Sequence, residues 1–362
     1  MIHSRRLSDS GGLTIAPHRH PHYHKESIPS SFPISPSISV SSPYSNVVST
    51  YQAAYTPRPA RCAWVTLLTK SSYLPGVITL AHTFREVGSA YPLLVICTPQ
   101  LPARARRILA AHDIQCRDVQ PLVPNQGAYE WSGAFKRFEE TWNKLRVFEL
   151  EEYDRVVLMD SDMVVLHNMD ELMTMPLPSR DWVAAAHVCA CNPRKLAHYP
   201  PDWVPKNCAH TSMHGRGSSS LANHPDNSPT SPRPYGSLNS GLVVLHPSLT
   251  TSEAIQTFLH TSPLVPTFQF PDQDLLSEFF RGRWRPLPYV YNALKTLSQC
   301  HTPMWSTEEV RCLHYILEKP WENRQGLFHD IWWEKWIVSR QTVHELCGEK
   351  DEEYVAQYVT AK

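Results

Sequence analysis

The sequence predicts an α/β fold in which helices flank a mainly parallel, twisted β-sheet. Short apolar runs of strand length alternate with longer stretches of helical periodicity, the pattern of a parallel sheet covered by helices. The run RVVLM at residues 155–159 is apolar on both faces, as the central strands of parallel sheets are. With 362 residues, 42 % of them hydrophobic, the chain can form a substantial core.

The alternation is clearest between residues 63 and 159. AWVTLL is a short apolar run that predicts a buried strand, and the next stretch has helical spacing with Pro75 in its first turn. The pattern predicts strands at 63–68, 92–97 and 155–159, and helices at 75–87, 102–112 and 141–153. It continues with strands at 182–186 and 241–245, and helices near 251–260 and 273–280 and at 329–346. We expect the aromatic face of the last helix to pack onto the domain.

Composition divides the chain into one domain and two tails. Residues 1–58 are rich in Ser, Pro and His and predict a disordered tail, whose run HRHPHYH is more typical of a solvated segment than of a metal site. We expect a single domain at 59–346, with a flexible insertion at 212–236 of similar composition. A C-terminal tail, 347–362, completes the prediction.

Charge and cysteine content exclude several classes of protein. The 34 basic and 34 acidic residues balance, which argues against an extended nucleic-acid surface. No window approaches the ~20 apolar residues of a membrane span, and the first residues lack the apolar core of a secretory signal. Nine scattered cysteines, an odd number, favour a reduced chain in the cytoplasm. Assembly into a homodimer is left open.

Two carboxylates follow RVVLM directly, at Asp160 and Asp162. Parallel sheets bind ligands beyond the carboxyl ends of their strands. Residues i and i+2 of an extended chain point the same way, so both carboxylates can converge while Ser161 turns aside. Two hard oxygen ligands suit Mg²⁺ or Mn²⁺, and such an ion lowers the cost of placing two charges in apolar surroundings.

Two other interpretations of this pair are considered, and the sequence argues against the second. An aspartate at a strand end can cap the turn that follows. A calcium loop would need an oxygen ligand at Val164 and glycine at Val165, and the sequence has neither.

Six blocks of sequence together resemble glycosyltransferase family 8, the group of glycogenin and galactinol synthase. The resemblance spans roughly residues 60–340, and KLRVFELEEY and HYILEKPW lean toward the galactinol-synthase-like branch. It implies a GT-A-like, Rossmann-like nucleotide-sugar transferase fold and an enzyme that moves a hexose from UDP-glucose or UDP-galactose. The blocks are RCAWVTLLTKSSYLPGVITLAHTF (61–84), TWNKLRVFELEEYDRVVLMDSDMVVLHNMDEL (141–172), LNSGLVVLHPS (238–248), FPDQDLLSEFF (270–280), PYVYN (288–292) and HYILEKPW (314–321).

The resemblance also implies how the donor is held. Asp160, Asp162 and His314 would bind Mn²⁺, with Mg²⁺ as the alternative, and the ion would neutralise charge on the departing UDP. Lys319 matches a lysine that contacts the donor phosphate, and Lys144 matches one near the donor. The glycine-containing loop before that phosphate lysine is altered, with Leu317 and Glu318 in its place and one residue fewer than in glycogenin.

The other matched positions would line the uridine and sugar sites. Tyr73 offers an aromatic face for a base, although packing at a helix start is its ordinary role, and Lys70 replaces an Asn common in glycogenin. An Asp-Gln pair at a helix start could equally cap that helix. By resemblance, Leu67, Thr69 and Tyr73 line the uridine site, Asn239, Ser240 and Gly241 form a turn that meets the sugar, and Asp272 and Gln273 face the transferred sugar, with Asp274 in place of a glycine.

The family retains anomeric configuration, by a covalent intermediate on a carboxylate or by same-face attack assisted by the leaving phosphate. Asp272 is the matched carboxylate for the first route, and we favour the second because a metal and lysines stabilise the leaving group without it. The region aligned with glycogenin's acceptor site, KTLSQCHTPMW, lacks tyrosine, so we expect a separate small-molecule or glycan acceptor.

A group of soft ligands lies outside these blocks, at Cys189, Cys191, Cys208 and His210. It could bind zinc, but Cys-x-Cys is not the usual spacing, and we favour free thiols in a loop over the acceptor cleft.

Two other functions are considered. A sugar-1-phosphate nucleotidyltransferase would need a glycine-rich loop where the chain has TKSSYLPG. A non-catalytic nucleotide-sugar-binding protein is disfavoured by the complete metal triad.

Overall fold

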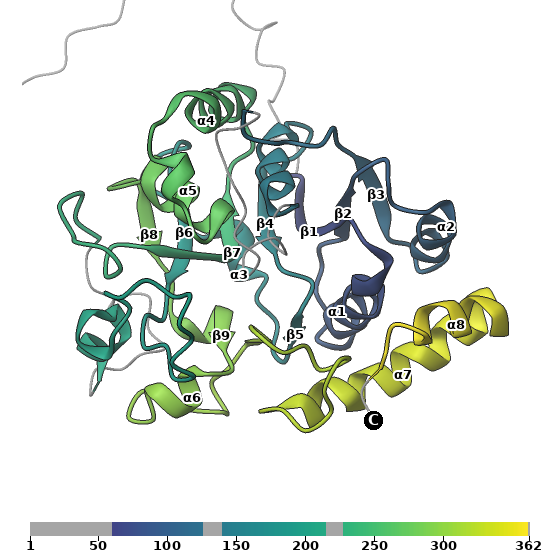
Figure 1. Ribbon diagram of the computed structural model, residues 1–362. Coiled ribbons are helices and arrows are strands. Elements are labelled where there is room, and N and C mark those ends of the chain that lie inside the picture. The colour runs from purple at the N-terminus through teal and green to yellow at the C-terminus, as the bar shows by residue number, and fades with distance from the viewer. Residues whose placement is uncertain (1–59, 126–139, 215–226, 361–362) are drawn as a thin grey trace, which may run out of the picture. The chain divides into compact units, whose positions relative to one another are not determined.

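A seven-stranded sheet forms the core of the computed structural model, which describes residues 60–125, 140–214 and 227–360. The strand order is β3-β2-β1-β4-β7-β6-β8 (Figure 1). Strands β1, β2, β3 and β4 run parallel, whereas β7 runs antiparallel to both of its neighbours. The predicted α/β fold with a mainly parallel sheet is therefore confirmed. The strands are β1 (Cys62–Leu68), β2 (Leu93–Cys97), β3 (Gln115–Asp118), β4 (Arg155–Met159), β6 (Val183–His187), β7 (Leu238–Leu245) and β8 (Trp284–Pro286).

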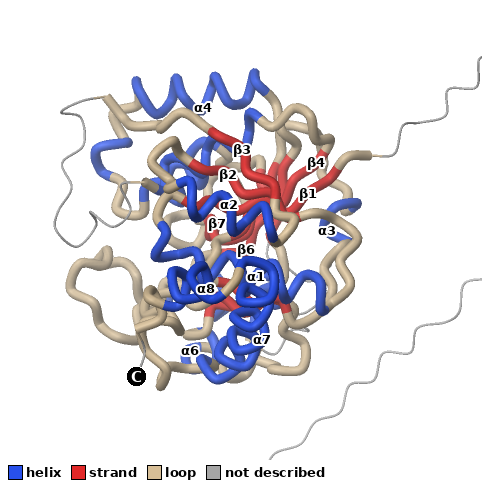
Figure 2. The backbone as a smooth tube through the Cα atoms, turned by 90° about the vertical axis from the view of Figure 1, so that its right-hand side faces the viewer, coloured by secondary structure: helices blue, strands red, loops and turns tan. Residues whose placement is uncertain are grey.

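Helices cover both faces of this sheet. Successive strand residues point to opposite faces, so the apolar side chains on each face need a covering layer. In β1, Trp64 packs on the side of α1, α2 and α7, whereas Ala63 and Val65 pack on the side of α4 and α5. Figures 1 and 2 show α1, α7 and α8 side by side. The helices are α1 (Leu74–Glu86), α2 (Ala103–Ala111), α3 (Glu171–Thr174), α4 (Leu249–Thr261), α5 (Pro271–Phe279), α6 (Leu297–Cys300), α7 (His329–Cys347) and α8 (Glu349–Ala356).

The segment predicted as an α-helix at 141–153 is instead a 3₁₀-helix, η3 (Thr141–Glu149). Its large apolar side chains Trp142, Leu145 and Phe148 are buried and recur every third residue. A helix with three residues per turn places such residues directly above one another on one face. This face packs against α4 and α5.

A second, three-stranded sheet was not predicted. It has the order β5-β10-β9, formed by β5 (Met163–Val165), β10 (Cys312–His314) and β9 (Ala293–Leu294). Strand β10 pairs antiparallel with β5, and His314 lies opposite Met163. The backbone N–H of Tyr315 donates to the carbonyl of Asp162 at 2.9 Å. This sheet therefore brings the HYILEKPW block against the residues that follow β4.

The chain after residue 346 differs from the predicted tail, because α8 occupies residues 349–356 and packs against α7. Arg104 on α2 lies 2.7 Å from Asp351, and the Tyr354 hydroxyl donates to Ser71 at 2.9 Å. These contacts hold α8 in place, because this charged helix has few apolar residues of its own to bury. Residues 1–59, with the predicted tail, and 215–226 of the predicted insertion lie outside the described residues. In the part of the chain that is described, no helix is long and apolar enough to cross a membrane.

Gly76 on α1 allows the chain after β4 to lie close to this helix. A Cβ atom at Gly76 would meet the Ser161 carbonyl oxygen at 2.6 Å and the Trp321 ring at 2.9 Å. Alanine normally stabilises a helix by about 1 kcal/mol relative to glycine. We expect Gly76→Ala to destabilise the protein instead, by about 1–3 kcal/mol, because the contact overpacks the site. Urea unfolding measures this, and a variant at least as stable as the wild type would contradict the close approach.

Candidate active site

A cleft of about 450 Å³ opens beyond the carboxyl ends of β1 and β4. Its size and position fit the ligand sites of open α/β sheets. The structure brings together every residue to which the sequence assigned a role in donor or sugar binding. The cleft is lined by Leu67, Thr69, Tyr73, Lys144, Asp160, Asp162, Asn239, Ser240, Gly241, Asp272, Gln273, His314 and Lys319, among others.

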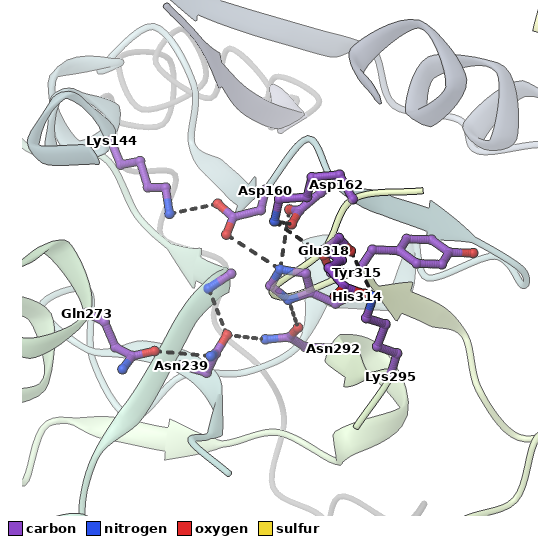
Figure 3. Close-up of polar contacts among 12 residues, drawn as sticks. Lys144, Asp160, Asp162, Asn239, Gln273, Asn292, Lys295, His314, Tyr315 and Glu318 are labelled. Carbon is purple, nitrogen blue, oxygen red and sulfur yellow. Dashed lines mark hydrogen bonds and ion pairs between the residues drawn. The ribbon is translucent and has the colours of Figure 1, made fainter. Parts of the chain in front are cut away.

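Asp160, Asp162 and His314 converge at the base of the cleft. Each offers a ligand atom, and these atoms all lie within 4.8 Å of one another. His314 Nε2 is 3.3 Å from Asp162 Oδ1 and 3.7 Å from Asp160 Oδ2 (Figure 3). The two acids come from the end of β4, whereas His314 is the last residue of β10.

Two lysines hold the other oxygens of these carboxylates. Lys144 Nζ lies 2.7 Å from Asp160 Oδ1 and 3.0 Å from Asp272 Oδ2, and Lys319 Nζ donates to Asp162 Oδ2. Asp160 and Asp162 thus each present one oxygen to a lysine and the other toward His314. Lys144 in addition connects the acidic pair with the Asp-Gln pair on α5.

The pKa shifts follow from these contacts. Burial would raise the pKa of Asp162, but Lys319 and His314 hold it well below its usual range. Burial would likewise lower the pKa of Lys144, but Asp160 and Asp272 outweigh it and raise that pKa. The charged forms are therefore favoured although the groups are buried.

A chain of amide side chains fixes the orientation of His314. The backbone N–H of Gly241 donates to Asn239 Oδ1 at 2.9 Å, and Asn292 Nδ2 donates to the same oxygen at 2.8 Å. This leaves Asn292 Oδ1 to face His314 Nδ1, 2.8 Å away (Figure 3). An amide oxygen only accepts, so Nδ1 carries a hydrogen and Nε2 is the ring nitrogen that faces the two carboxylates.

The three groups fit a divalent cation. They are two carboxylate oxygens and an imidazole whose second nitrogen is hydrogen-bonded, as in metal-binding histidines. Ligands about 2.0–2.1 Å from an octahedral Mg²⁺ lie about 3 Å apart. The observed separations of 3.3 and 3.7 Å need only a small contraction to reach this spacing.

Comparison with known proteins establishes the family. Residues 64–325 match the family model described as glycosyl transferase family 8. The chain belongs to glycosyltransferase family 8. Galactinol synthase 1 of Ajuga reptans is 30 % identical over 72 % of this chain and 74 % of its own length. Galactinol synthase 4 of Arabidopsis thaliana is 30 % identical over 73 % and 74 %. The predicted hexosyltransferase of the galactinol-synthase-like branch is confirmed, and a nucleotidyltransferase does not agree with this family.

Solved structures agree on the fold. The bifunctional glycosyltransferase WbbM aligns with a TM-score of 0.52 at 16 % identity, covering 83 % of this chain and 52 % of that one. The galactosyltransferase LgtC, solved with donor and acceptor sugar analogues, aligns with a TM-score of 0.50 at 14 % identity, covering 76 % and 95 %. The GT-A-like fold is therefore confirmed.

In this family 8 chain, Asn239, Ser240 and Gly241 lie within β7 and do not form the predicted turn. A Cβ atom at Gly241 would meet His314 Cε1 at 2.4 Å and Nδ1 at 2.8 Å. Glycine is needed there because the imidazole lies directly over its Cα.

The proposed uridine side of the cleft is built by the segment after β1. Thr69 donates a hydrogen bond to Glu140, and Lys70 lies 3.2 Å from the same carboxylate. Tyr73 packs edge-on against Trp321, with 5.5 Å between ring centroids, and also lines the cleft. Tyr73 thus combines the packing role and the cleft position that the sequence left as alternatives.

The altered loop before Lys319 keeps a glycine-like backbone. Leu317 has φ +69°, in the left-handed region that non-glycine residues adopt at a cost of roughly 1–2 kcal/mol. The carbonyl of Glu318 accepts a hydrogen bond from Lys295 Nζ at 2.7 Å, and its carboxylate lies 2.9 Å from Arg194. Burial, and then Lys319, lower the pKa of Lys295 to about 8.

Sequence reasoning missed Asn292 and Lys295. Asn292 ends the PYVYN block, which was quoted for the family resemblance but given no role. Lys295 follows three residues later and is buried, with His329 Nε2 2.8 Å from its Nζ. The sequence around Lys295 has no motif that would have indicated its contacts with the Glu318 carbonyl and with His329.

Asp272 and Asp274 on α5 behave differently from each other. The Asp272 carboxylate accepts from Lys144, and it does not cap α5, so the capping alternative is not seen for this residue. Asp274 instead accepts hydrogen bonds from the backbone N–H groups of Gln269 and Phe270 at 2.9 and 3.0 Å. Asp274 therefore fixes the start of α5 and is not among the residues that line the cleft.

The cysteine group differs from the predicted one in its histidine. Cys189, Cys191 and Cys208 gather around His301, whereas His210 Nε2 lies 3.1 Å from the carbonyl of His187. His210 is near Cys208 in sequence, but its ring is directed to the end of β6. The sequence could not show that His301, far along the chain, replaces it.

Asp274 predicts a pH dependence of stability. Burial raises its pKa to about 6 from 3.8, so the native state binds this proton more tightly than the unfolded chain does. The wild type therefore loses stability from Asp274 as the pH rises from about 4 to about 6. Relative to the wild type, Asp274→Asn should gain roughly 2–3 kcal/mol across that window.

Urea unfolding at both ends of this pH range measures the effect. Asp202→Asn, at an exposed position, serves as the control and should show no such trend. A difference between Asp274→Asn and the wild type that does not change with pH would contradict the buried-carboxylate explanation.

Proposed function

We propose that the protein is a metal-dependent, retaining transferase that moves a hexose from UDP-glucose or UDP-galactose to the hydroxyl of a separate acceptor. The observation that carries this proposal is the convergence of Asp160, Asp162 and His314 between two lysines in one cleft. The curated relatives are named galactinol synthases, so UDP-galactose is the first donor that we would test.

Asp160 Oδ2, Asp162 Oδ1 and His314 Nε2 would hold the cation, which we expect to be Mn²⁺, with Mg²⁺ as the alternative. When bound, such an ion neutralises negative charge on the diphosphate leaving group. Asn292 Oδ1 accepts from His314 Nδ1–H, which leaves Nε2 as the ring nitrogen that would bind the ion. Lys144 is paired with Asp160, and Lys319 is paired with the buried Asp162, whose pKa it helps to lower.

The lysines also supply positive charge to the donor. An ammonium group suits phosphate as a compact point charge. Lys319 follows the Leu317–Glu318 loop, which Lys295 and Arg194 hold in place, so its ammonium group is well fixed at the cleft. Lys144 lies between the metal ligands and the sugar side and positions Asp160 and Asp272 at the same time.

Asp272 and Gln273 would face the transferred sugar. Asp272 Oδ2 is paired with Lys144, which reduces the nucleophilicity of this carboxylate. Gln273 Oε1 accepts a hydrogen bond from Asn239 Nδ2 at 3.1 Å, which connects the sugar side with the amide chain behind His314. These contacts favour same-face attack over a covalent intermediate on Asp272.

A separate acceptor is supported by the two tyrosines of PYVYN. Both are buried, Tyr289 with 0 % and Tyr291 with 5 % of its surface exposed. The Tyr289 hydroxyl accepts from the backbone N–H of Ser306, and the Tyr291 hydroxyl donates to Glu171. Hydroxyls held in this way are poor acceptors for a sugar.

We also propose that the protein works in the cytoplasm. All nine cysteines are unpaired, as expected in a reducing compartment.

Removing one metal ligand tests the proposed function. A panel of UDP-sugars with Mn²⁺, and with polyol or saccharide acceptors, should show acceptor-dependent release of UDP. Asp162→Asn should lower turnover by about 10³-fold or more, because metal stabilisation of the leaving group contributes several kcal/mol. Asp202→Asn is the control and should keep full activity.

Substantial turnover by Asp162→Asn would contradict the metal assignment. Binding of UDP with Mn²⁺ but no turnover of any donor would instead favour the non-catalytic alternative.

Asn292 predicts a second, independent effect on the metal. Asn292→Ala removes the acceptor that holds His314 Nδ1–H, and such partners typically affect metal affinity by about 10–100-fold. We expect a loss of Mn²⁺ affinity of that size, measured by calorimetric titration. Asn292→Asp keeps an acceptor for His314 Nδ1–H but loses the donor to Asn239, so it should retain more affinity than Asn292→Ala. Equal affinities of Asn292→Ala and the wild type would show that the amide chain does not orient the ligand.

A further inference from the structure

Three segments that are distant in sequence meet beside the cleft. Cys189 and Cys191 follow β6, Cys208 directly precedes the 3₁₀-helix η5 (Ala209–Met213), and His301 follows α6. Their three sulfur atoms and one histidine nitrogen all lie within 4.8 Å of one another. Cys208 and His301 are only 2 % and 1 % exposed. The function proposed above makes no use of this group.

The distances within the group match those between ligands of one metal ion. His301 Nε2 lies 3.6 Å from the sulfur of Cys189, 3.2 Å from that of Cys191 and 3.5 Å from that of Cys208. Sulfur and nitrogen ligands of a tetrahedral zinc ion, with Zn–S about 2.3 Å and Zn–N about 2.0–2.1 Å, lie about 3.5 Å apart. The imidazole nitrogen therefore stands at ligand distance from all three thiols at once.

A neighbouring side chain orients the imidazole. His301 Nδ1 lies 2.9 Å from His214 Nε2, so its other nitrogen, Nε2, is directed at the sulfur atoms. Metal-binding histidines commonly have such a partner on the nitrogen that does not bind the metal. A chance contact between thiols would not require it.

We propose that Cys189, Cys191, Cys208 and His301 bind a structural zinc ion. Three thiolates and one imidazole complete a tetrahedral shell, and a closed shell of protein ligands is typical of structural sites. The ligands are soft, whereas the acidic group at Asp160 and Asp162 offers hard oxygens that suit Mn²⁺ or Mg²⁺. The chain thus carries two metal sites of different chemistry.

The zinc ion holds one wall of the cleft. Asn192, Arg194, Tyr199 and Trp203 line the cleft and lie on the loop between the second and third cysteine ligands. Arg194 is paired with Glu318, next to Lys319. A metal that ties this loop to β6 and α6 fixes side chains that face the substrate, although the ion itself contacts no substrate.

Zinc analysis of the full-length protein tests the proposal without any activity measurement. The untagged chain is purified under reducing conditions, dialysed against a weak chelator and analysed for zinc by mass spectrometry. We expect the wild type to retain a single zinc ion per chain, and Cys208→Ser and His301→Ala to lose it.

Three control variants separate this site from others. Cys300→Ser removes a thiol that contacts Cys189 and Cys191 but lies outside the group of four, and it should retain zinc; loss of zinc from this variant would overturn the assignment of His301 as the fourth ligand. Cys347→Ser, at the end of α7, should also retain it. Asp162→Asn should retain it too, so failure of the acidic metal site is distinguishable from failure of this one. Any zinc held by the histidines of the N-terminal run would remain in Cys208→Ser and can be subtracted.

Replacement of zinc by cobalt keeps the test independent of whether a variant folds. Co²⁺ in the wild-type protein should give the thiolate-to-metal charge-transfer band and the intense visible bands of a tetrahedral sulfur site. A reduced wild type that contains no zinc and shows no such bands with Co²⁺ would overturn the proposal. Retention of zinc by Cys208→Ser, together with loss of zinc from Asp162→Asn, would also overturn the proposal.

Discussion

The pairing of two three-residue strands, β5 and β10, is the constraint on which the site depends. It places His314 opposite Met163, immediately after the acids that follow β4. The hydrogen bond from the Tyr315 N–H to the Asp162 carbonyl closes this junction. Gly241 lets the His314 imidazole lie close to β7, and Gly76 lets the Ser161 carbonyl lie close to α1. A side chain at either glycine would push that neighbour away. Backbone pairing and two glycines, more than the ligands themselves, set the geometry of the cleft.

Charge compensation explains how this junction tolerates its carboxylates. Asp160, Asp162 and Asp272 share two lysines, and none of the three lies in an apolar environment without a partner. Each of the two converging acids keeps one oxygen for a cation. The lysines thus hold the acidic pair ready for a metal, and in the proposed reaction they also attract the donor phosphates. A second site of soft ligands beside the cleft would stabilise one of its walls independently of this charge network.

The sequence predicted the elements whose signal is local. Strands β1 and β4 and helix α1 were correct within one or two residues, because their apolar runs and the proline at the helix start are strong signals. The acidic pair and its histidine were found because a family pattern joined blocks that local periodicity could not join. All the matched positions then met in one cleft. Strands of three residues, such as β5 and β10, carry no periodic signal, and their pairing arises only from the tertiary structure.

Other features could not be predicted for similar reasons. Both an α-helix and a 3₁₀-helix place Trp142, Leu145 and Phe148 on one face, so their spacing could not distinguish η3 from the predicted α-helix. Helix α8 is highly charged and depends on contacts with α2 and α7. His210 was grouped with the thiols because it is close to Cys208 in sequence, whereas the fold brings the distant His301 to them.

The central claim, that Asp160, Asp162 and His314 bind one cation at the diphosphate, is tested most directly by anomalous diffraction from crystals soaked with Mn²⁺ and UDP. We predict a manganese peak between Asp160 Oδ2, Asp162 Oδ1 and His314 Nε2, in contact with the diphosphate. A peak at any other place, or a His314 ring turned away from the ion while UDP is bound, would contradict the account.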